Sequence, residues 1–338
     1  MKPRNILIVN TFGIGDVLFS TPLIRELKRN FPGSNVHYLC NRRNFDLLKN
    51  NPDIKSIIVF EKDDFRNVFK RSKIEFFRRF SNFVKKIKKL KADVAIDLTL
   101  NYQMSLLLLL AGVRTRIGFN YKNRGKFLTH KIELTGFEKK HVVRYYLDLL
   151  KFLNLSVSDN HRLWSYPSEA DKAATDNFMK VNNFTGKTLI GFAAGGGKSW
   201  GKDAFYRRWE NDNFAYIGRK LSEMYNVNIL IFGTTEEKEV CDEICEKIGN
   251  KSISLCGATE LNLFIELVSR CKLFICNEGG PLHVAVSKGV NTISIFGPVD
   301  DKVYGPYPMS DRHVVVKAEN VACRPCYKNF KHARCETR

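Results

Sequence analysis

The sequence lacks an apolar run long enough to cross a bilayer. Its longest, Leu106 to Val113, falls far short of the roughly 20 residues that a membrane helix needs. The first residues lead directly into the strand-like run 6–9, without the apolar region and small-residue cleavage site of a signal peptide. We therefore expect a cytoplasmic protein, and a peripheral position on a membrane surface is left open.

Acidic residues are few. The 35 Asp and Glu oppose 55 Lys and Arg, which gives a net charge of +20. The excess lies in residues 1–165, with 32 basic residues against 14 acidic ones, whereas residues 166–338 have 23 against 21. Such asymmetry indicates that the first half faces a polyanion: nucleic acid, anionic lipid or phosphorylated glycan. No helix-turn-helix, zinc-finger or RNP signature accompanies the charge.

Short apolar runs alternate with amphipathic segments along the chain. Strands are predicted at 5–10, 35–40, 55–60, 93–98, 114–119, 187–193, 227–233, 251–256, 272–276 and 291–296. Helices are predicted at 16–31, 43–50, 65–91, 101–111, 140–153, 211–225, 236–248, 260–270 and 281–288. This alternation predicts an α/β fold with mainly parallel sheets.

The polar stretch 154–168 interrupts this alternation and reads as a linker. We expect two doubly wound, Rossmann-like domains, residues 1–160 and 161–338. Ligands in such sheets bind at the carboxyl ends of the strands, and the two sets of strand ends could face each other across a cleft.

Cysteines number nine, an odd count that cannot pair fully within one chain. Without an export signal they are expected to be reduced. Six lie in helix- or strand-like surroundings and are expected to be small core residues: Cys40, Cys241, Cys245, Cys256, Cys271 and Cys276.

The carboxyl-terminal residues Cys323, Cys326, His332 and Cys335 have the spacing C-x2-C-x5-H-x2-C. Four such ligands could close a tetrahedral structural zinc site. The spacing is short and lacks the form of paired zinc knuckles. Reduced thiols or a labile disulfide are therefore the alternatives.

Gly13-Ile14-Gly15-Asp16 follows the first predicted strand and opens a helix. The glycines suit a tight turn, but a dinucleotide fingerprint needs a third glycine where Leu18 or Phe19 stands. Asp16 either caps the helix and complements its dipole or acts as a general base toward a hydroxyl.

A second turn, Asn277-Glu278-Gly279-Gly280-Pro281-Leu282-His283, also joins a strand to a helix. Proline suits the first turn of a helix, and the two glycines before it let backbone approach a ligand closely. The N–H groups there would face an anion, most plausibly a nucleotide diphosphate, flanked by Glu278 and His283.

Two further turns have weaker signals. Gly195-Gly196-Gly197-Lys198 precedes Lys202 and Arg207, which suits phosphate, although the Walker A spacing is absent and a flexible turn is the alternative. Glu236 and Glu237 follow the strand at 227–233. A glutamate there could accept hydrogen bonds from ribose hydroxyls or complement a helix dipole.

Basic residues cluster between Lys62 and Lys91, with aromatic and aliphatic side chains every three or four positions. A helix of this pattern can lie in a membrane interface. Such a stripe can also pack on its own sheet and leave the charges solvated. In both cases the charges could serve an anionic acceptor.

Together these pieces resemble glycosyltransferase family 9, the ADP-heptose:lipopolysaccharide heptosyltransferases and their relatives, which have a GT-B fold. The resemblance covers nearly the whole chain. It is carried by GIGDVLFSTPLIRELKRNFP, GGGKSWGKDAFYRRWENDNFAYIGRKL, FGTTEEKE, NEGGPLHVAVSKGVNTISIFGPVDDKVYGPYP and the CRPC-Y-KNF pattern near the end.

The resemblance implies a role for each turn. Asp16 matches the catalytic base, next to Gly13 and Gly15 at the acceptor-side turn, and Glu237 matches the ribose-binding glutamate. The diphosphate site corresponds to Asn277, Glu278, Gly279, Gly280 and His283. The phosphate cation is Arg207, with Lys198 and Lys202 as rivals.

Two departures from the family are visible. Glu278 and Gly279 replace the usual Asp-Thr, so nucleotide contacts can differ. Arg207-Arg208-Trp209 stands where the family has Lys-Arg-Trp. Arginine can grip a diphosphate bidentately, so the function could survive this exchange.

The implied activity is inverting sugar transfer that needs neither metal nor cofactor. The donor is a nucleotide-sugar, by family default ADP-heptose, and the acceptor is lipopolysaccharide core or a related phosphorylated lipid-linked glycan. The basic first domain would contact the anionic inner membrane, and no nucleic acid is expected. A GT-B sugar-nucleotide epimerase is one alternative, but no convincing acid–base pair is visible. A basic nucleic-acid-binding protein, suggested by charge alone, is the other. Whether the chain is truncated after Cys335 is left open.

Overall fold

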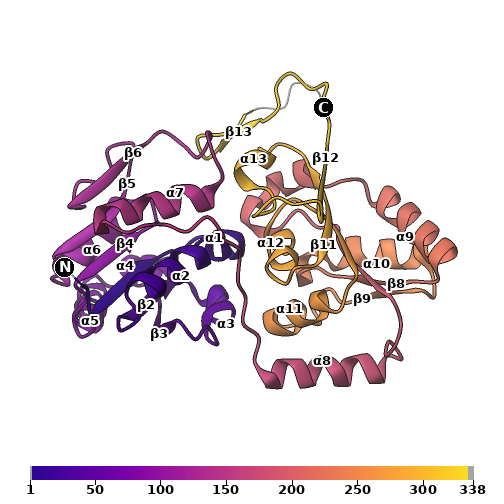
Figure 1. Cartoon of the computed structure of the whole chain (residues 1–338), viewed down its shortest axis with the longest axis horizontal. Coiled ribbons are helices and arrows are strands. Elements are labelled where there is room, and N and C mark those ends of the chain that lie inside the picture. The colour runs from indigo at the N-terminus through magenta and orange to yellow at the C-terminus, as the bar shows by residue number, and fades with distance from the viewer. Residues whose placement is uncertain (1, 334–338) are drawn as a thin grey trace. The chain divides into compact units, whose positions relative to one another are not determined.

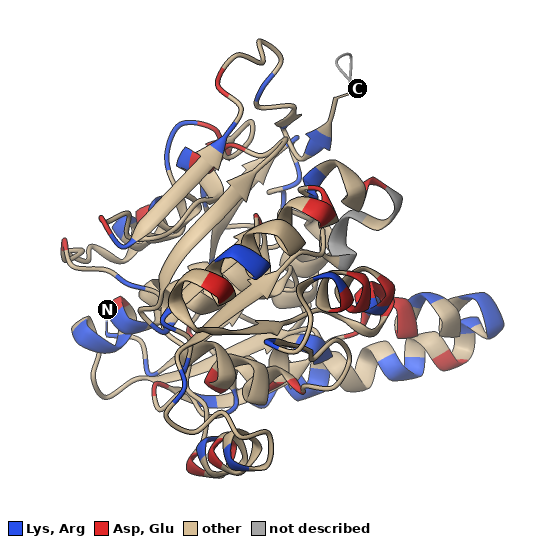
Figure 2. Ribbon diagram, turned by 90° about the vertical axis from the view of Figure 1, so that its right-hand side faces the viewer, with Lys and Arg blue, Asp and Glu red and all other residues tan. Residues whose placement is uncertain are grey.

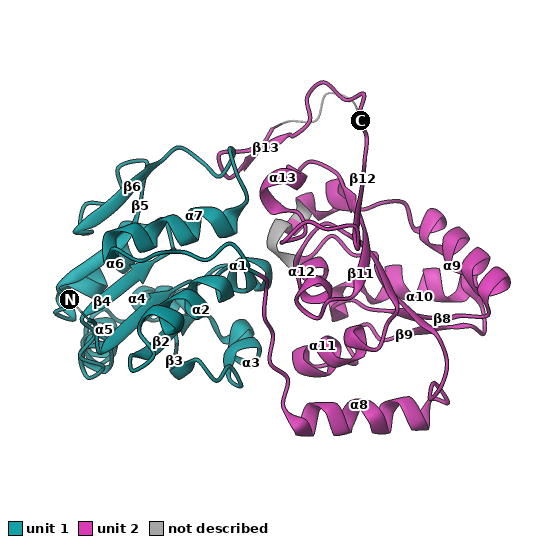
Figure 3. Ribbon diagram, viewed as in Figure 1, with its two compact units in different colours: residues 1–161 teal, residues 162–338 magenta. Residues whose placement is uncertain are grey.

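Two compact units make up the chain, residues 1–161 and 162–338 (Figure 3). The computed structural model describes residues 2–333, apart from the side chains of residues 198–200 and 202. Each unit is built on a six-stranded parallel sheet with helices before and after its strands (Figure 1). The expected α/β architecture of two Rossmann-like sheets is confirmed.

The sheet of unit 1 has the order β3-β2-β1-β4-β5-β6. Its strands are β1 (Asn5–Val9), β2 (Asn35–Cys40), β3 (Ile54–Val59), β4 (Val94–Asp97), β5 (Thr115–Tyr121) and β6 (His130–Leu134). Its helices are α1 (Ile14–Phe19), α2 (Thr21–Asn30), α3 (Phe45–Leu48), α4 (Lys62–Arg71), α5 (Lys73–Lys88), α6 (Tyr102–Leu110) and α7 (Val142–Asp148). Leu7 and Val9 pack against Ile87 of α5 and Leu107 of α6, which cover one sheet face.

The sheet of unit 2 has the order β12-β11-β10-β7-β8-β9. Its strands are β7 (Leu189–Ala193), β8 (Asn228–Ile231), β9 (Ser252–Ser254), β10 (Leu273–Asn277), β11 (Asn291–Phe296) and β12 (His313–Lys317). Its helices are α8 (Glu169–Val181), α9 (Asn211–Tyr225), α10 (Lys238–Ile248), α11 (Leu261–Ser269), α12 (Gly280–Ser287) and α13 (Asp301–Tyr304), followed by the β13–β14 hairpin (Tyr327–Lys328 and Lys331–His332).

Both sheets share one topology. Within each unit, the first strand lies centrally beside the second and the fourth, as in dinucleotide-binding folds. The chain reverses direction of winding between the first and fourth strands, so a crevice is expected outside their carboxyl ends in each unit. In unit 1 these strands are β1 and β4; in unit 2 they are β7 and β10.

Three sequence predictions need correction. The single helix expected at 65–91 is two, because Ser72 is extended and its hydroxyl accepts a hydrogen bond from the Glu75 N–H, which starts α5. The edge strands β6 and β12 were missed: charged residues interrupt the apolar pattern of β6, and the apolar run of β12 is only three valines long, two of them exposed. Helix α8 was missed because Thr175 is its sole buried residue among those described.

The cysteines also depart in part from expectation. Cys241 of α10 and Cys256, after β9, form a disulfide with their Cα atoms 6.5 Å apart. The prediction that both are reduced was therefore wrong. It could not be avoided from the sequence, because spacing does not reveal which cysteines meet. Cys40, Cys271 and Cys276 are free and buried, as expected, and burial raises the pKa of each thiol.

The length, the apolarity and the basic residues of the helices bear on contact with a membrane. Among residues 2–333, no helix combines the length and apolarity needed to cross a bilayer. Lys and Arg, blue in Figure 2, recur along the exposed sides of the helices.

Candidate functional site

Asp16 lies at the carboxyl end of β1, in the first turn of α1. Gly13 caps this helix, and its N–H donates to the Asp16 Oδ2 at 3.2 Å. Burial is the main reason that the pKa of Asp16 rises to about 6, while the Gly13 N–H and the charge of Arg43 oppose the rise. The carboxyl group therefore caps its helix and is also basic enough to accept a proton near neutral pH.

Asparagines that sequence reasoning missed hold the loop before Asp16. The Asn10 amide donates to the Asp16 carbonyl at 3.1 Å, and its Oδ1 accepts from the Phe12 N–H. The amides of Asn41 and Asn44 both donate to the Phe12 carbonyl. Their sequence signal is a polar residue directly after a buried strand: Asn10 follows β1 and Asn41 follows β2.

A second carboxyl group, Asp97, ends β4 beside the last residue of β1. It is buried, its Oδ1 accepts from the N–H and hydroxyl of Thr99, and burial raises its pKa to about 6. Asp97 ends β4, and Asp16 lies in the helix that follows β1, so each crevice-forming strand of unit 1 leads to a carboxyl group whose pKa is raised.

In unit 2, Asn277 joins three segments at the carboxyl edge of the sheet. It ends β10, its amide donates to the Ala194 carbonyl at 2.6 Å, and its Oδ1 accepts from the Trp209 N–H at 3.0 Å. Asn277 therefore fixes the turn that leads into α12.

The turn into α12 contains the remaining residues of the predicted diphosphate site. Gly279 is the N-cap with φ of 141°, Gly280 opens the helix, and His283 is buried in its first half. The first N–H groups of a helix have no intrahelical acceptor, so this end can bind an anion.

Glu278 and Arg207 form a buried pair beside this turn. The Arg207 Nε lies 3.5 Å from the Glu278 Oε1, its Nη2 donates to the Glu278 carbonyl at 2.7 Å, and its Nη1 donates to the Gly196 carbonyl. Burial raises the pKa of Glu278 to about 7, although the charges of Arg207 and Arg324 lower it. Arg207 thus connects the Gly196 turn to the α12 turn.

The glycine at position 279 is matched to this arginine. A Cβ there would lie 3.1 Å from the Arg207 Nη2, and the positive φ disfavours other residues. Glycine at position 279, where the family has threonine, therefore leaves room beside the turn for the Arg207 guanidinium.

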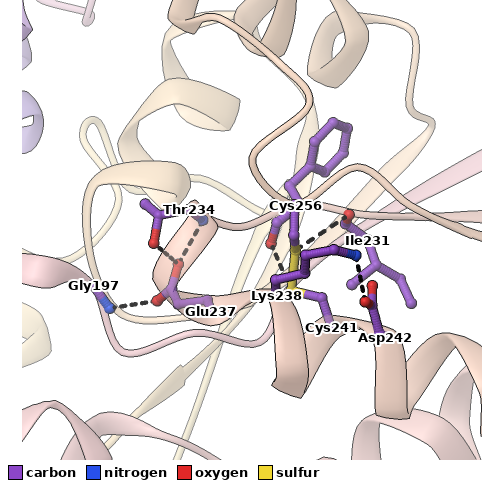
Figure 4. Close-up of a disulfide and its surroundings, with 9 residues drawn as sticks. Gly197, Ile231, Thr234, Glu237, Lys238, Cys241, Asp242 and Cys256 are labelled. Carbon is purple, nitrogen blue, oxygen red and sulfur yellow. Dashed lines mark hydrogen bonds and ion pairs between the residues drawn. A yellow bond between two sulfur atoms is a disulfide. The ribbon is translucent and has the colours of Figure 1, made fainter.

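Glu237 connects two loops at the same edge (Figure 4). Its Oε1 accepts from the Gly197 N–H at 3.1 Å, and its Oε2 accepts from the N–H and the hydroxyl of Thr234. It lies one helical turn before Cys241, whose disulfide underlies this loop. Glu237 is positioned by both loops and keeps further oxygen lone pairs for a ligand.

Gly195→Ala should displace Glu237. The added Cβ would lie 1.9 Å from the Glu237 Oε1, so the side chain must move, at a cost of about 1–3 kcal/mol in unfolding free energy. We expect nucleotide affinity to fall as well, measured by calorimetry beside a urea melt. Gly33→Ala is the control, because no atom lies within 4 Å of its added Cβ. Unchanged affinity and stability would separate Glu237 from nucleotide binding.

The segment after β12 reaches this edge too, through a residue that sequence analysis did not select. Arg324 donates to the carbonyls of Gly297 and Val299 and pairs with Asp301 at 3.2 Å. Its position between two cysteines in a short polar segment was the available signal.

The predicted zinc ligands are divided. The Sγ atoms of Cys323 and Cys326 lie 3.9 Å apart, while the ring of His332 stacks on Tyr206. No group of three or more potential metal ligands occurs within the described residues. Cys335 lies outside those residues, as do the side chains of Lys198 and Lys202, so these predictions stay predictions.

Solved structures with this fold include known glycosyltransferases. A family 9 glycosyltransferase from Veillonella parvula superposes with a TM-score of 0.80, at 22% identity over 93% of this chain and 87% of that one. The Escherichia coli ADP-heptose lipopolysaccharide heptosyltransferase II gives 0.74, at 21% identity over 92% and 90%.

Sequence comparison agrees along nearly the full length. Lipooligosaccharide heptosyltransferase 2 of Campylobacter jejuni is 24% identical over 329 residues, which are 95% of this chain and 90% of that protein. The family description "Glycosyltransferase family 9 (heptosyltransferase)" matches residues 80–335. Since this match spans most of the chain, the protein belongs to glycosyltransferase family 9 and is a heptosyltransferase-like glycosyltransferase.

Proposed function

We propose that the protein transfers a heptose, with inversion, from ADP-heptose to lipopolysaccharide core or a related lipid-linked glycan. The observation that carries the proposal is the carboxyl edge of unit 2, where a helix N-terminus, a buried arginine and an oriented glutamate converge. That combination suits a diphosphate and a ribose. Relatives named heptosyltransferases, one with ADP-heptose in its description, support the choice of donor.

Unit 2 is proposed to bind the nucleotide. The N–H groups at the start of α12 and the imidazole of His283 receive the diphosphate, and Glu237 accepts from the ribose hydroxyls. Arg207 orients the turn through two carbonyls and adds positive charge near the phosphates. As the sugar–phosphate bond breaks, the leaving ADP gains charge, which these groups stabilise more than the intact donor.

Unit 1 is proposed to act on the acceptor. A hydroxyl oxygen of the acceptor forms the new bond to the anomeric carbon on the face opposite the departing ADP. Its proton passes to the Asp16 carboxylate. Gly13 keeps that carboxylate in place through its N–H, and no metal ion or cofactor takes part in the proposed step.

A screen of ADP-, UDP-, GDP- and CDP-sugars tests the donor assignment. At 100 times its Kd, a ligand adds about 2.7 kcal/mol of stability, on the order of 5–10 °C in Tm for a unit of this size. We expect ADP-heptose to produce that shift and to label a lipopolysaccharide-core acceptor. A shift with another nucleotide alone would reassign the donor, and conversion of the donor to an epimer without acceptor would contradict transfer.

A further inference from the structure

Helices α4 and α5 form an antiparallel hairpin held by aromatic side chains. At its base, Phe83 of α5 lies 5.3 Å from Phe60 and 5.6 Å from Phe65 of α4, measured between ring centroids. Farther along, Phe69 and Phe76 lie 5.1 Å apart. Residues 60–83 therefore form one projecting element with its corner at Ser72.

The hairpin connects β3 to β4 and packs on the core of unit 1 through the second half of α5, at Phe80, Phe83, Val84 and Ile87. Phe60 directly follows β3, so its contact with Phe83 lies near the carboxyl end of that strand. From Phe83, α5 runs down toward the start of β4 in one direction and back to Lys73 in the other. At 1.5 Å per residue, the corner lies about 15 Å from Phe83 along α5.

The tip of this hairpin is apolar and exposed. Ile74 is 85% exposed, Phe77 63% and Phe69 46%, whereas nearer the base of α5 Ile87 is buried and Phe83 partly buried in the core. No residue of α4 is buried. Phe69 and Phe77 each contact Phe76, but the exposed faces of these three side chains have no role in the core of the unit.

The hairpin and its continuation are strongly basic. Residues 62–91 contain 12 Lys and Arg but only three acidic residues. At the tip, Lys70, Arg71 and Lys73 surround the apolar side chains, and Glu75 is paired with Arg78 and Arg79. Asp63 and Asp64 lie at the opposite end of α4.

We propose that the hairpin tip, defined by Phe69, Ile74 and Phe77, docks the enzyme on an anionic phospholipid bilayer. Apolar side chains ringed by cations match an interface of acyl chains beneath negative headgroups. A second copy of this chain fits less well, because two such tips would bring like charges together. Duplex nucleic acid offers Ile74 no apolar surface.

Vesicle sedimentation with the full chain tests this proposal. The variant Phe69→Ser/Ile74→Ser/Phe77→Ser should partition at least about 30-fold less onto vesicles of phosphatidylcholine and phosphatidylglycerol. Val181→Ser/Met224→Ser/Tyr225→Ser is the matched control, since it changes three apolar side chains of unit 2 that are also largely exposed. The control should bind within about twofold of wild type.

The charges give a second, independent variant set. Lys70→Gln, Arg71→Gln and Lys73→Gln should each weaken binding about fivefold, and only where the vesicles contain anionic lipid. Transfer to a lipid-free core oligosaccharide should be unchanged in every hairpin variant, which distinguishes failed docking from a wrong assignment of donor or reaction.

Three results would overturn the proposal. The first is wild-type partitioning by the apolar tip variant with its melting curve intact. The second is equal binding to neutral and anionic vesicles. The third is vesicle binding that persists in the apolar tip variant while another property is lost. That property would be a dimer formed by the wild type, or binding of the wild type to duplex nucleic acid.

Discussion

Asp16→Asn should lower kcat for sugar transfer by about 10²- to 10⁴-fold, the usual contribution of a general base. The amide is nearly isosteric and its oxygen can still accept from the Gly13 N–H, so α1 keeps its cap. Donor affinity should stay within about twofold, because the proposed nucleotide contacts all lie in unit 2. The loss would therefore be confined to the step that removes the acceptor proton.

Steady-state transfer assays with ADP-heptose, beside calorimetry with ADP, measure both quantities. Asp46→Asn is a matched control, since Asp46 is also a first-turn carboxylate in unit 1 but is exposed. Turnover of the Asp16 variant near that of wild type would remove Asp16 from the base role and leave it as a helix cap.

The raised pKa of Asp16 gives the same variant a pH signature. Wild-type kcat should climb about tenfold per pH unit below 6 and level off above 7, because only the ionised carboxylate accepts a proton. Ionising a group whose folded pKa is raised from 3.8 to about 6 destabilises the fold as pH rises through that range. Asp16→Asn should then be more stable than wild type at pH 8, by about 2–3 kcal/mol, with no gain at pH 3.

The fold was predictable from local signals because its interior strands are buried on both faces. Runs such as Ile6–Val9 and Leu273–Asn277 are nearly continuous in apolar residues, and the turns after them contain glycine. The edge strands β6 and β12 are partly exposed, β6 has charged residues between its apolar ones, and β12 has a run of only three valines, so the same signal fails there. The positions of the strands could thus be predicted where burial on both faces requires apolar residues.

The turns of the candidate site were predictable for a related reason, whereas the contacts between them were not. Gly13 to Asp16 and Asn277 to His283 are contiguous in sequence, so turn chemistry identifies them. The pairing of Arg207 with Glu278 spans 71 positions, and the support of Phe12 by Asn44 spans 32. No periodicity records such distances, and the Cys241–Cys256 disulfide was missed for the same reason.

Arg207→Ala should have the largest effect in unit 2, on stability and nucleotide binding together. It removes donors from two carbonyls and the counter-charge from a buried carboxylate. Losing one partner of a buried pair costs about 3–5 kcal/mol. Without the guanidinium, which lowers it, the pKa of Glu278 must rise above about 7. At pH 6 the Glu278 carboxyl group is neutral and does not need the counter-charge. At pH 8 it would ionise in the wild type, and without Arg207 that ionisation is costly. The loss of unfolding free energy should therefore be greater at pH 8.

A double-mutant cycle isolates this contribution. Arg207→Ala/Glu278→Gln should recover part of the stability lost in Arg207→Ala, because no charge is left buried, yet should not restore ADP affinity. Arg207→Lys keeps the charge but cannot reach both carbonyls, and should behave like the alanine variant. Urea melts at pH 6 and pH 8 give the unfolding free energies of the variants, and calorimetry gives their ADP affinities. Arg219→Ala, on the exposed side of α9, is the control. A greater loss of ADP affinity in Lys198→Ala or Lys202→Ala would transfer the phosphate-binding role to that lysine.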